Sequence, residues 1–515
     1  MGRQESVDFL IIGSGVAGLR AAIELAPHGD VLVVTKDIPS ESSTEYAQGG
    51  IAVALSDEDE VGIHYEDTLK AGDGLCREDA VRILVEEGPE SILELISWGA
   101  EFDKECSRLA FTLEAAHSRK RILHAHGDAT GKELERVLLQ KVRSFPSVGR
   151  SPFTMAVDLI VQDGGCIGAY VLRDRKISPV FARATILASG GGGQIFSITT
   201  NPQVATADGM AIAYRAGAEL EDMEFVQFHP TGLYLPSAPH FLLSEAMRGE
   251  GGRLRNINRE PFMQRYHPMA ELAPRNVVAS AIISEMFITK SSHVYLDLTH
   301  LDAGFVKKRF PRIYSTCLKY EVDITKDLIP VSPAAHYMMG GVKTDTGGGT
   351  SIKGLFAAGE VACTGVHGGN RLASNSLLEG LVYGKRAGSS ALSSVRGMGR
   401  PPEAEAMPPA FTFHSIPAHD EIRGQMRKLM WEKVGIIRCK DSLTAAKEKL
   451  GEWQYILDKT FATRRELELK NMLQTAALIT EAALLREGSV GAHYRTDFPG
   501  RGENWQRHIA MIKGR

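Results

Sequence analysis

The sequence lacks the features that would place the protein in a membrane or in a metal-centred class. No apolar run reaches the ~18–20 residues that a membrane-spanning helix needs. The six cysteines never occur in a Cys-x-x-Cys spacing, which argues against a disulfide framework, a zinc site or an iron–sulfur cluster. We therefore predict no bound metal and no redox pairing among the cysteines, which lie at positions 76, 106, 166, 317, 363 and 439.

A strong charge imbalance is also absent. The 59 basic residues nearly balance the 63 acidic ones, giving a net charge of −4, so nothing favours binding to nucleic acid or to an anionic membrane surface. The polar start, Met1 to Ser6, leads directly into an apolar run and leaves no room for a signal peptide. We predict a cytoplasmic protein, and 515 residues suggest two to four domains.

The clearest pattern present is a dinucleotide-binding signature close to the N-terminus. Residues 7–12 form a mostly apolar run of strand length, and glycines follow at positions 13, 15 and 18. Such glycines allow a tight turn, close approach to a pyrophosphate and close helix–strand packing. A second strand is expected at 31–34, and the acidic residue that usually follows it is replaced by Thr35-Lys36. This replacement disfavours NAD and assigns the adenosine contacts to Thr35, Lys36 or backbone groups.

A second signature, typical of FAD-binding proteins, lies more than 300 residues later, at Gly354 to Glu360. A carboxylate that ends a strand, as Glu360 is expected to do, accepts hydrogen bonds from ribitol hydroxyls. The two signatures together predict a flavin-binding domain built from both sides of a long insertion. The fold class is therefore α/β, with a doubly wound (Rossmann-like) FAD-binding domain, an inserted α+β capping domain and a C-terminal helical domain.

Changes in sequence texture suggest the domain boundaries. We expect the FAD-binding domain at 1–225 and 336–395, the capping domain at 226–335, a proline-rich linker at 396–410 and the helical domain at 411–515. Within the first part, a helix should begin near Thr130, with Glu133 in a capping-box spacing. Its expected apolar face consists of Leu134, Val137, Leu138 and Val142.

Several longer stretches make nearly the whole chain resemble a known family. They are Ser43 to Ala52, His117 to Ala125, Glu224 to Thr231, Glu245 to Gly251, Leu272 to Arg275, Pro333 to Tyr337 and Gly369 to Leu377. The chain resembles the L-aspartate oxidase family, within the succinate dehydrogenase/fumarate reductase flavoprotein superfamily. In succinate dehydrogenases a histidine tethers the flavin where this chain has Ser43, so the resemblance implies non-covalent FAD. Glu114 occupies the place where aspartate oxidases carry a glutamate beside the substrate.

The resemblance also implies which residues bind the cofactor. The turn after the first strand should hold the pyrophosphate, Lys36 should lie near the adenosine, and the stretch from Ser43 to Gly50 should surround the isoalloxazine ring. The implied cofactor-binding residues are Gly13, Ser14, Gly15, Ala17, Gly18, Lys36, Ser43, Thr44, Ala47, Gln48, Gly49, Gly50, Asp208, Glu360, Ser376 and Leu377.

A four-carbon dicarboxylate substrate needs donors at both ends. Arg371 suits one carboxylate bidentately, and His229 and His336 suit further contacts as neutral or charged donors. By resemblance, Arg275 lies beside the reacting carbon, where either a proton-transfer or a substrate-clamping role is open. The implied catalytic residues are Arg275, His229, His336 and Glu114, and the implied substrate-binding residues are Arg371, Ser244, Glu245 and Gln227. Arg248 and Glu250 are open between a structural ion pair and a place near the substrate.

The resemblance implies oxidation of L-aspartate to iminoaspartate, with hydride transfer to flavin N5 and reoxidation by oxygen or fumarate. This is the first step of NAD (quinolinate) biosynthesis, so transient contact with quinolinate synthase is plausible. We expect a monomer without nucleic-acid or membrane partners. The alternatives are a soluble fumarate reductase or succinate-oxidising flavoprotein, and an electron-transfer subunit docked on an iron–sulfur assembly, against which Ser43 counts.

Overall fold

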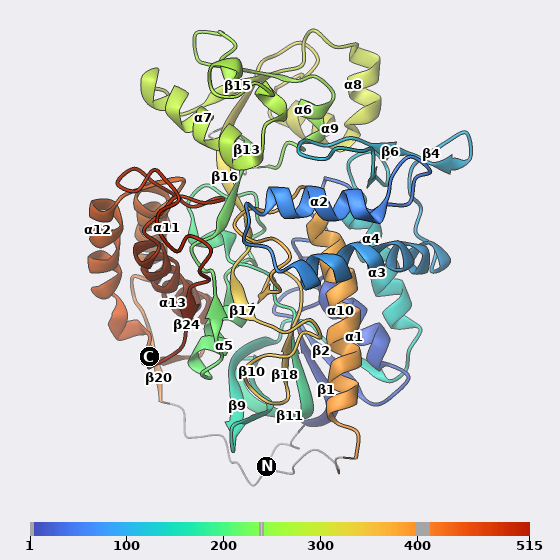
Figure 1. Ribbon diagram of the computed structural model, residues 1–515. Coiled ribbons are helices and arrows are strands. Elements are labelled where there is room, and N and C mark those ends of the chain that lie inside the picture. The colour runs from blue at the N-terminus through green and yellow to red at the C-terminus, as the bar shows by residue number, and fades with distance from the viewer. Residues whose placement is uncertain (1–4, 236–237, 239–240, 398, 400–411, 515) are drawn as a thin grey trace.

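Three parts of the chain follow one another from the base to the top and side of the molecule (Figure 1). The computed structural model describes residues 5–235, 238, 241–397, 399 and 412–514. A large sheet with its helices forms the base, the segment around 226–338 forms the top, and three C-terminal helices pack along one side (Figure 1). This arrangement is the α/β fold with an inserted cap and a C-terminal helical part that the sequence predicts.

The base is a seven-stranded sheet in the order β8-β2-β1-β11-β10-β9, with β18 also paired to β11. Five strands run parallel: β1 (Glu5–Ile12), β2 (Val31–Val34), β8 (Val148–Ser151), β11 (Lys176–Leu187) and β18 (Leu355–Ala357). The strands β9 (Met155–Gln162) and β10 (Gly165–Arg173) extend it antiparallel. Because β18 pairs with β11 from Thr185↔Leu355 onward, the chain after the insertion rejoins the sheet.

Helices cover this sheet, and two of them join the halves of the chain. The first helix, α1 (Val16–Leu25), packs along α10 (Asn375–Ser394). A methyl group on Gly384 would lie 2.6 Å from the carbonyl oxygen of Ala17, so only glycine permits this approach. The other helices of the base are α2 (Val61–Ala71), α3 (Glu78–Ser97), α4 (Thr130–Arg143) and α5 (Asp208–Arg215).

Helix α4 confirms part of the sequence prediction and corrects another part. It begins at Thr130, and all four residues of its predicted apolar face are fully buried. The expected capping box is wrong, because Thr130 Oγ1 accepts the backbone N–H of Ala125 instead. The Glu133 carboxylate accepts the N–H of Glu101 and pairs with Arg136. Tertiary partners thus replace the local cap.

The top of the molecule is a four-stranded antiparallel sheet with short helices. Its strands, in the order β13-β16-β15-β14, are β13 (Val226–Leu233), β16 (Ile329–Met338), β15 (Val294–Asp297) and β14 (Arg253–Arg255). Its helices are α6 (Ala246–Gly249), α7 (Arg275–Ile288), α8 (Ala303–Arg309) and α9 (Pro311–Lys319), with 3-10 turns at Met263–Arg265 and Ala270–Leu272. Strand β16 continues through the proposed boundary at residue 335, so the chain enters and leaves the cap along paired strands (Figure 1).

The C-terminal part consists of α11 (His419–Val434), α12 (Lys440–Gly451) and α13 (Arg464–Leu485). Helix α13 packs on α5 of the base. The chain then returns, and β24 (Ala510–Met511) pairs with β12 (Leu220–Glu221) in a sheet with β17 (Gly341–Lys343) and β19 (Ala362–Cys363). Most of the proposed linker at 396–410 lies outside the described residues.

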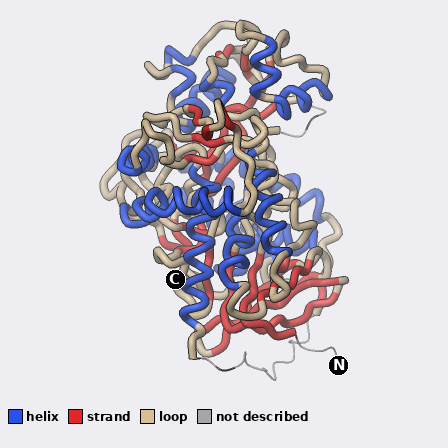
Figure 2. Tube along the Cα trace, turned by 90° about the vertical axis from the view of Figure 1, so that its right-hand side faces the viewer, coloured by secondary structure: helices blue, strands red, loops and turns tan. Residues whose placement is uncertain are grey.

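The turned view in Figure 2 shows the large sheet at one end and the cap at the other. No helix in the described ranges is long and apolar enough to cross a membrane. The short elements are β3 (Ile51–Ala52), β4 (Lys104–Glu105), β5 (Arg108–Leu109), β6 (Phe111–Thr112), β7 (Ile122–Leu123), β20 (Phe413–His414), β21 (Ile437–Arg438), β22 (Thr460–Phe461), β23 (Tyr494–Arg495), and the 3-10 turns Gly193–Ile195 and Gln454–Ile456.

Candidate active site

A deep cavity runs from the carboxyl ends of the parallel strands to the underside of the cap. It encloses about 1690 Å³, including its open mouth. Its lining combines the turn after β1, the loop at 41–50, the turn after β11, the segment at 358–360 and the start of α10 with residues of β13, β16 and α7. Ligands of open α/β sheets bind at this edge, so the fold itself directs a ligand to the cavity.

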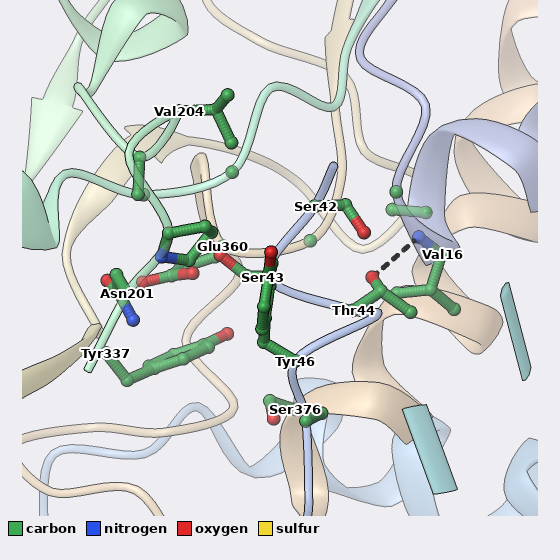
Figure 3. Close-up of a pocket in the computed structure, with 18 of the residues that line it drawn as sticks. Val16, Ser42, Ser43, Thr44, Tyr46, Asn201, Val204, Tyr337, Glu360 and Ser376 are labelled. Atoms are coloured by element: carbon green, nitrogen blue, oxygen red, sulfur yellow. Dashed lines mark hydrogen bonds between the residues drawn. The ribbon is translucent and has the colours of Figure 1, made fainter. Parts of the chain in front are cut away.

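One end of the cavity is shaped for a phosphate group. Gly13 has φ of 118°, and a methyl group on it would lie 2.1 Å from the carbonyl oxygen of Ala188. Helix α1 begins immediately afterwards, and Thr44 Oγ1 accepts the N–H of Val16 at 3.1 Å (Figure 3). The other N–H groups of the first turn point their partial positive charge at the cavity. A pyrophosphate therefore fits this end.

Substitution of Gly13 tests this assignment. Gly13→Ala places a methyl group against backbone at a left-handed φ, so the turn must shift. We expect FAD affinity to fall by about tenfold or more, measured as the flavin-to-protein absorbance ratio after dialysis.

The matched control is Gly62→Ala in α2, where an added methyl group meets nothing within 4 Å. It should leave the flavin content unchanged. A Gly13→Ala protein that keeps full flavin would contradict the assignment.

The loop at 41–50 forms the cavity wall where the family resemblance places the isoalloxazine ring. Ser43 lines the cavity (Figure 3), and a hydroxyl there offers no imidazole nitrogen for a covalent link to the flavin. The remaining predicted residues of the loop also line the cavity: Thr44, Ala47, Gln48, Gly49 and Gly50.

Lys36, found where an acidic residue was expected, belongs to a buried charge network. Its Nζ lies 2.6 Å from Asp208 Oδ2 and 2.9 Å from Glu468 Oε1 on α13. Lys36 and Asp208 both line the cavity. Asp208 on α5 and Glu468 on α13 therefore hold this lysine in place from two different parts of the chain.

Glu360 and Ser376 also line the cavity (Figure 3). Glu360 Oε1 accepts the N–H of Met338 at 3.0 Å, and burial raises the pKa of this carboxyl to about 7. Ser376 Oγ accepts from Arg371 Nη1 at 3.0 Å, so a predicted cofactor residue also supports a predicted substrate residue. Leu377 lines the same wall.

At the cap end, two histidines face the cavity from neighbouring strands. The rings of His229 on β13 and His336 on β16 lie 5.2 Å apart. Burial and the neighbouring arginines hold the pKa of both imidazoles well below the ordinary value, so both are neutral. The backbone N–H of Thr231 donates to His229 Nδ1 at 3.2 Å, which leaves the proton of His229 on Nε2. His229 is therefore a hydrogen-bond donor through Nε2.

Arg275, the first residue of α7, shares a carboxylate with a second buried arginine. Its Nε donates to Glu245 Oε2 at 2.6 Å, and Arg248 Nη2 donates to Glu245 Oε1 at 2.8 Å. Burial acts to raise the pKa of Glu245, but the two arginines outweigh it and hold that pKa below its ordinary value. Arg248 thus pairs with Glu245, whereas Glu250 pairs with Arg309, so the alternative of an Arg248–Glu250 pair is wrong.

Gln227 lies behind these groups and connects the two cavity arginines. Its Oε1 accepts from Arg275 Nη1 at 2.9 Å, and its Nε2 donates to the carbonyl oxygen of Arg371 at 2.8 Å. Gln227 does not line the cavity, so its direct contact with a substrate stays a prediction.

Gly18 also lies outside the lining and packs against the carbonyl oxygen of Gly13. Ser244 lines the cavity beside Glu245.

Glu114 brings a buried carboxyl group with one unpaired oxygen to the same end. It is 2% exposed, and Oε2 accepts from Ser374 Oγ at 2.7 Å, whereas Oε1 has no partner. Burial and the charge of Glu245 raise the pKa of Glu114. An unpaired buried carboxylate is costly, and a cationic group on a ligand would relieve that cost.

Several residues of this site escaped the sequence analysis. Thr200 Oγ1 lies 2.9 Å from His336 Nδ1, Ser374 holds Glu114, and Tyr337 lines the cavity. The Thr200 and Ser374 contacts join segments more than 130 residues apart, so no local spacing could indicate them.

One group among the described residues has the composition of a metal site. Glu221, Asp222 and His508 place ligand atoms within 4.8 Å of one another. However, Arg77, Lys343 and Arg486 form ion pairs with the two acids. The group therefore behaves as a salt-bridge network rather than as a cation site.

The fold and the cavity define a flavoprotein of the oxidoreductase class with non-covalently bound FAD. The family model described as FAD binding domain matches residues 8–377. The one described as fumarate reductase flavoprotein C-term matches residues 423–515.

Full-length relatives identify the family more narrowly. L-aspartate oxidase 2-a of Nicotiana tabacum is 43% identical over 96% of this chain and 82% of its own length. L-aspartate oxidase of Yersinia pestis is 41% identical over 98% of each chain. The chain belongs to the L-aspartate oxidase family.

Solved structures agree with this fold. A chain of E. coli quinol fumarate reductase is 32% identical with a TM-score of 0.93, covering 99% of this chain and 94% of that one. Mycobacterium smegmatis Sdh1 is 32% identical with a TM-score of 0.87 over the same shares.

Proposed function

We propose that the protein oxidises L-aspartate to iminoaspartate with FAD as the primary electron acceptor, in the first step of NAD (quinolinate) biosynthesis. The observation that carries the proposal is the unpaired Oε1 of Glu114 in a cavity that is also lined by Arg275 and Arg371. A dicarboxylate satisfies the cations, and only a substrate that also has an ammonium group satisfies Glu114. Close relatives bear the name L-aspartate oxidase.

The residues of the cavity bind and orient the substrate. Arg371 holds one carboxylate, and His229 donates from Nε2 to the other. Arg275 lies between Glu245 and Gln227, and its Nη2 has no partner among the described residues. Arg275 lines the cavity, and we propose that it contacts the substrate beside the reacting carbon, as a clamp or as a proton-transfer group.

When bound, FAD supplies the acceptor for the hydride from the α-carbon, at flavin N5. The substrate gives up a hydride and an amine proton, and oxygen or fumarate takes the two electrons in the second half of the cycle. Residues of β13, β16 and α7 line the substrate end of the cavity, and a cap closed over a bound substrate would exclude water. Because iminoaspartate is unstable in water, a consuming enzyme such as quinolinate synthase is a suitable transient partner. A monomer in the cytoplasm fits this role.

Anaerobic reduction of the holoenzyme tests the substrate. We expect L-aspartate to bleach the flavin absorbance within one turnover and succinate to leave the flavin oxidised, because succinate has no ammonium for Glu114. D-aspartate is the control for stereochemistry and should react far more slowly. Bleaching by succinate alone would reject the proposal in favour of a succinate-oxidising flavoprotein, for which the same arginines and histidines provide a dicarboxylate site.

A further inference from the structure

Arg371 has few contacts for a buried guanidinium. Nη1 donates to Ser376 Oγ, and Nε is buried without a partner. No described carboxylate forms an ion pair with Arg371, in contrast to Arg275, which pairs with Glu245. Burial and the charge of Arg275 lower the pKa of Arg371 to about 10. The charge of Arg371 is thus left for a ligand, and something other than an ion pair must hold its orientation.

The principal support is the ring of Tyr337. The guanidinium carbon of Arg371 lies 4.4 Å from the centre of this ring, which is a cation–π contact. Tyr337 lies on β16 directly after His336, and its ring lines the cavity (Figure 3). Arg371 comes just before α10. The ring therefore joins a cap strand to the arginine of the FAD-binding part.

Tyr337 is itself anchored by a buried carboxylate. Its hydroxyl donates to Glu379 Oε2 at 2.6 Å, His367 Nε2 lies 3.0 Å from the same oxygen, and Thr364 Oγ1 donates to Oε1 at 2.6 Å. Burial and the charge of Glu379 raise the pKa of Tyr337 well above its ordinary value, so the phenol keeps its proton. A fully engaged carboxylate holds the tyrosine hydroxyl and so fixes the plane of the ring.

We propose that Tyr337, anchored by Glu379, is a positioning residue that orients the Arg371 guanidinium for a substrate carboxylate. The inference rests on the proposed function in that the carboxylate belongs to the substrate. It also assigns a purpose to the buried group of Glu379, His367 and Thr364, which anchors Tyr337 but does not itself line the cavity. The ring face orients the guanidinium and leaves its positive charge available for the substrate. A carboxylate in the same place would neutralise that charge.

Substitutions at position 337 separate the ring from the hydroxyl. Tyr337→Leu removes the ring, and we expect KM for L-aspartate to rise roughly 5- to 30-fold with kcat within about threefold of wild type. Tyr337→Phe keeps the ring but releases it from Glu379, so its rise in KM should be smaller. The matched control is Tyr383→Phe on α10, another buried tyrosine whose hydroxyl donates to a backbone oxygen, that of Ala80. It should leave KM unchanged.

A double-mutant cycle with Arg371→Lys tests whether Tyr337 acts through the arginine. Lysine keeps the charge but loses the planar group that stacks on the ring, so Tyr337→Leu should change KM much less in that background. Additive effects of the two substitutions would overturn the proposal. So would a fall in kcat or in flavin content that accounts for the whole loss of activity.

Binding of succinate, followed through the perturbation of the flavin spectrum, provides a readout independent of turnover. Its affinity should fall in Tyr337→Leu by the same factor as KM rises. If wild-type protein fails to oxidise L-aspartate, the proposed function fails, whereas the succinate titration still decides the role of Tyr337. Unchanged succinate affinity in Tyr337→Leu would refute that role.

Discussion

Arg275→Leu is expected to lower kcat/KM for L-aspartate by about 10³-fold or more, because it removes the cation that we propose to lie beside the reacting carbon. The guanidinium is 8% exposed and donates to Glu245 and Gln227, with Nη2 left for the substrate. Steady-state kinetics with matched flavin content would measure the loss.

Two further variants separate chemistry from folding. Loss of Arg275 leaves Glu245 with Arg248 alone, so stability should fall by less than the cost of leaving a buried charge without any partner. Arg275→Lys keeps a positive charge next to Glu245, yet it should still lose about 10²-fold because an ammonium cannot contact Glu245, Gln227 and a substrate in one plane. Arg253→Leu removes an exposed arginine of the cap and should leave activity unchanged. A folded, flavin-bound Arg275→Leu protein with more than about a tenth of wild-type kcat/KM would refute the assignment.

Glu114→Gln is expected to raise KM for L-aspartate roughly 30- to 1000-fold while succinate binds as well as before or better. Glutamine keeps the hydrogen bond from Ser374 and the size of the side chain but removes the charge that the substrate ammonium needs. A methyl group on Gly49 would lie 3.9 Å from Glu114 Oε1, which places the Glu114 carboxyl group beside the loop at 41–50. The ratio of L-aspartate to succinate affinity is the measurement.

The pH profile offers a second readout for Glu114. Burial and Glu245 raise its pKa above the ordinary 4.5, so on acidification Glu114 takes up a proton at a higher pH than an exposed glutamate does. Wild-type kcat/KM for L-aspartate should therefore fall as the pH drops through this raised pKa. Glu114→Gln should lose this acidic limb.

Glu135→Gln is the matched control for Glu114→Gln. Glu135 is a buried glutamate that accepts one serine hydroxyl, from Ser42, and has an unpaired Oε1, but it does not line the cavity. The control should preserve the preference for L-aspartate. An unchanged preference in Glu114→Gln would show that the ammonium binds elsewhere.

Local patterns predicted the elements of the cofactor end well. The apolar run at 7–12 lies within β1, Gly13 and Gly15 lie in the turn before α1, and the face of α4 from Leu134 to Val142 is buried as expected. The capping box failed at α4 because Thr130 and Glu133 find partners in other segments. Partners from other segments also decide the contacts of Lys36, which pairs with Asp208 and Glu468 rather than staying free for a nucleotide.

The sequence by itself determined the fold class and the flavin-binding signatures, because glycine turns, apolar periodicity and motif spacing are local properties of the chain. Most of the site residues that the family resemblance implied line the cavity, whereas Gln227 and Gly18 do not. Only the tertiary structure decided which charges neutralise one another. Glu245 pairs with both Arg275 and Arg248, Glu114 keeps one oxygen unpaired, and Arg371 rests on Tyr337. Except for the nearby Arg248, these partners come from different parts of the chain. Their electrostatics depend on distance and burial, which exist only after the cap has folded over the sheet.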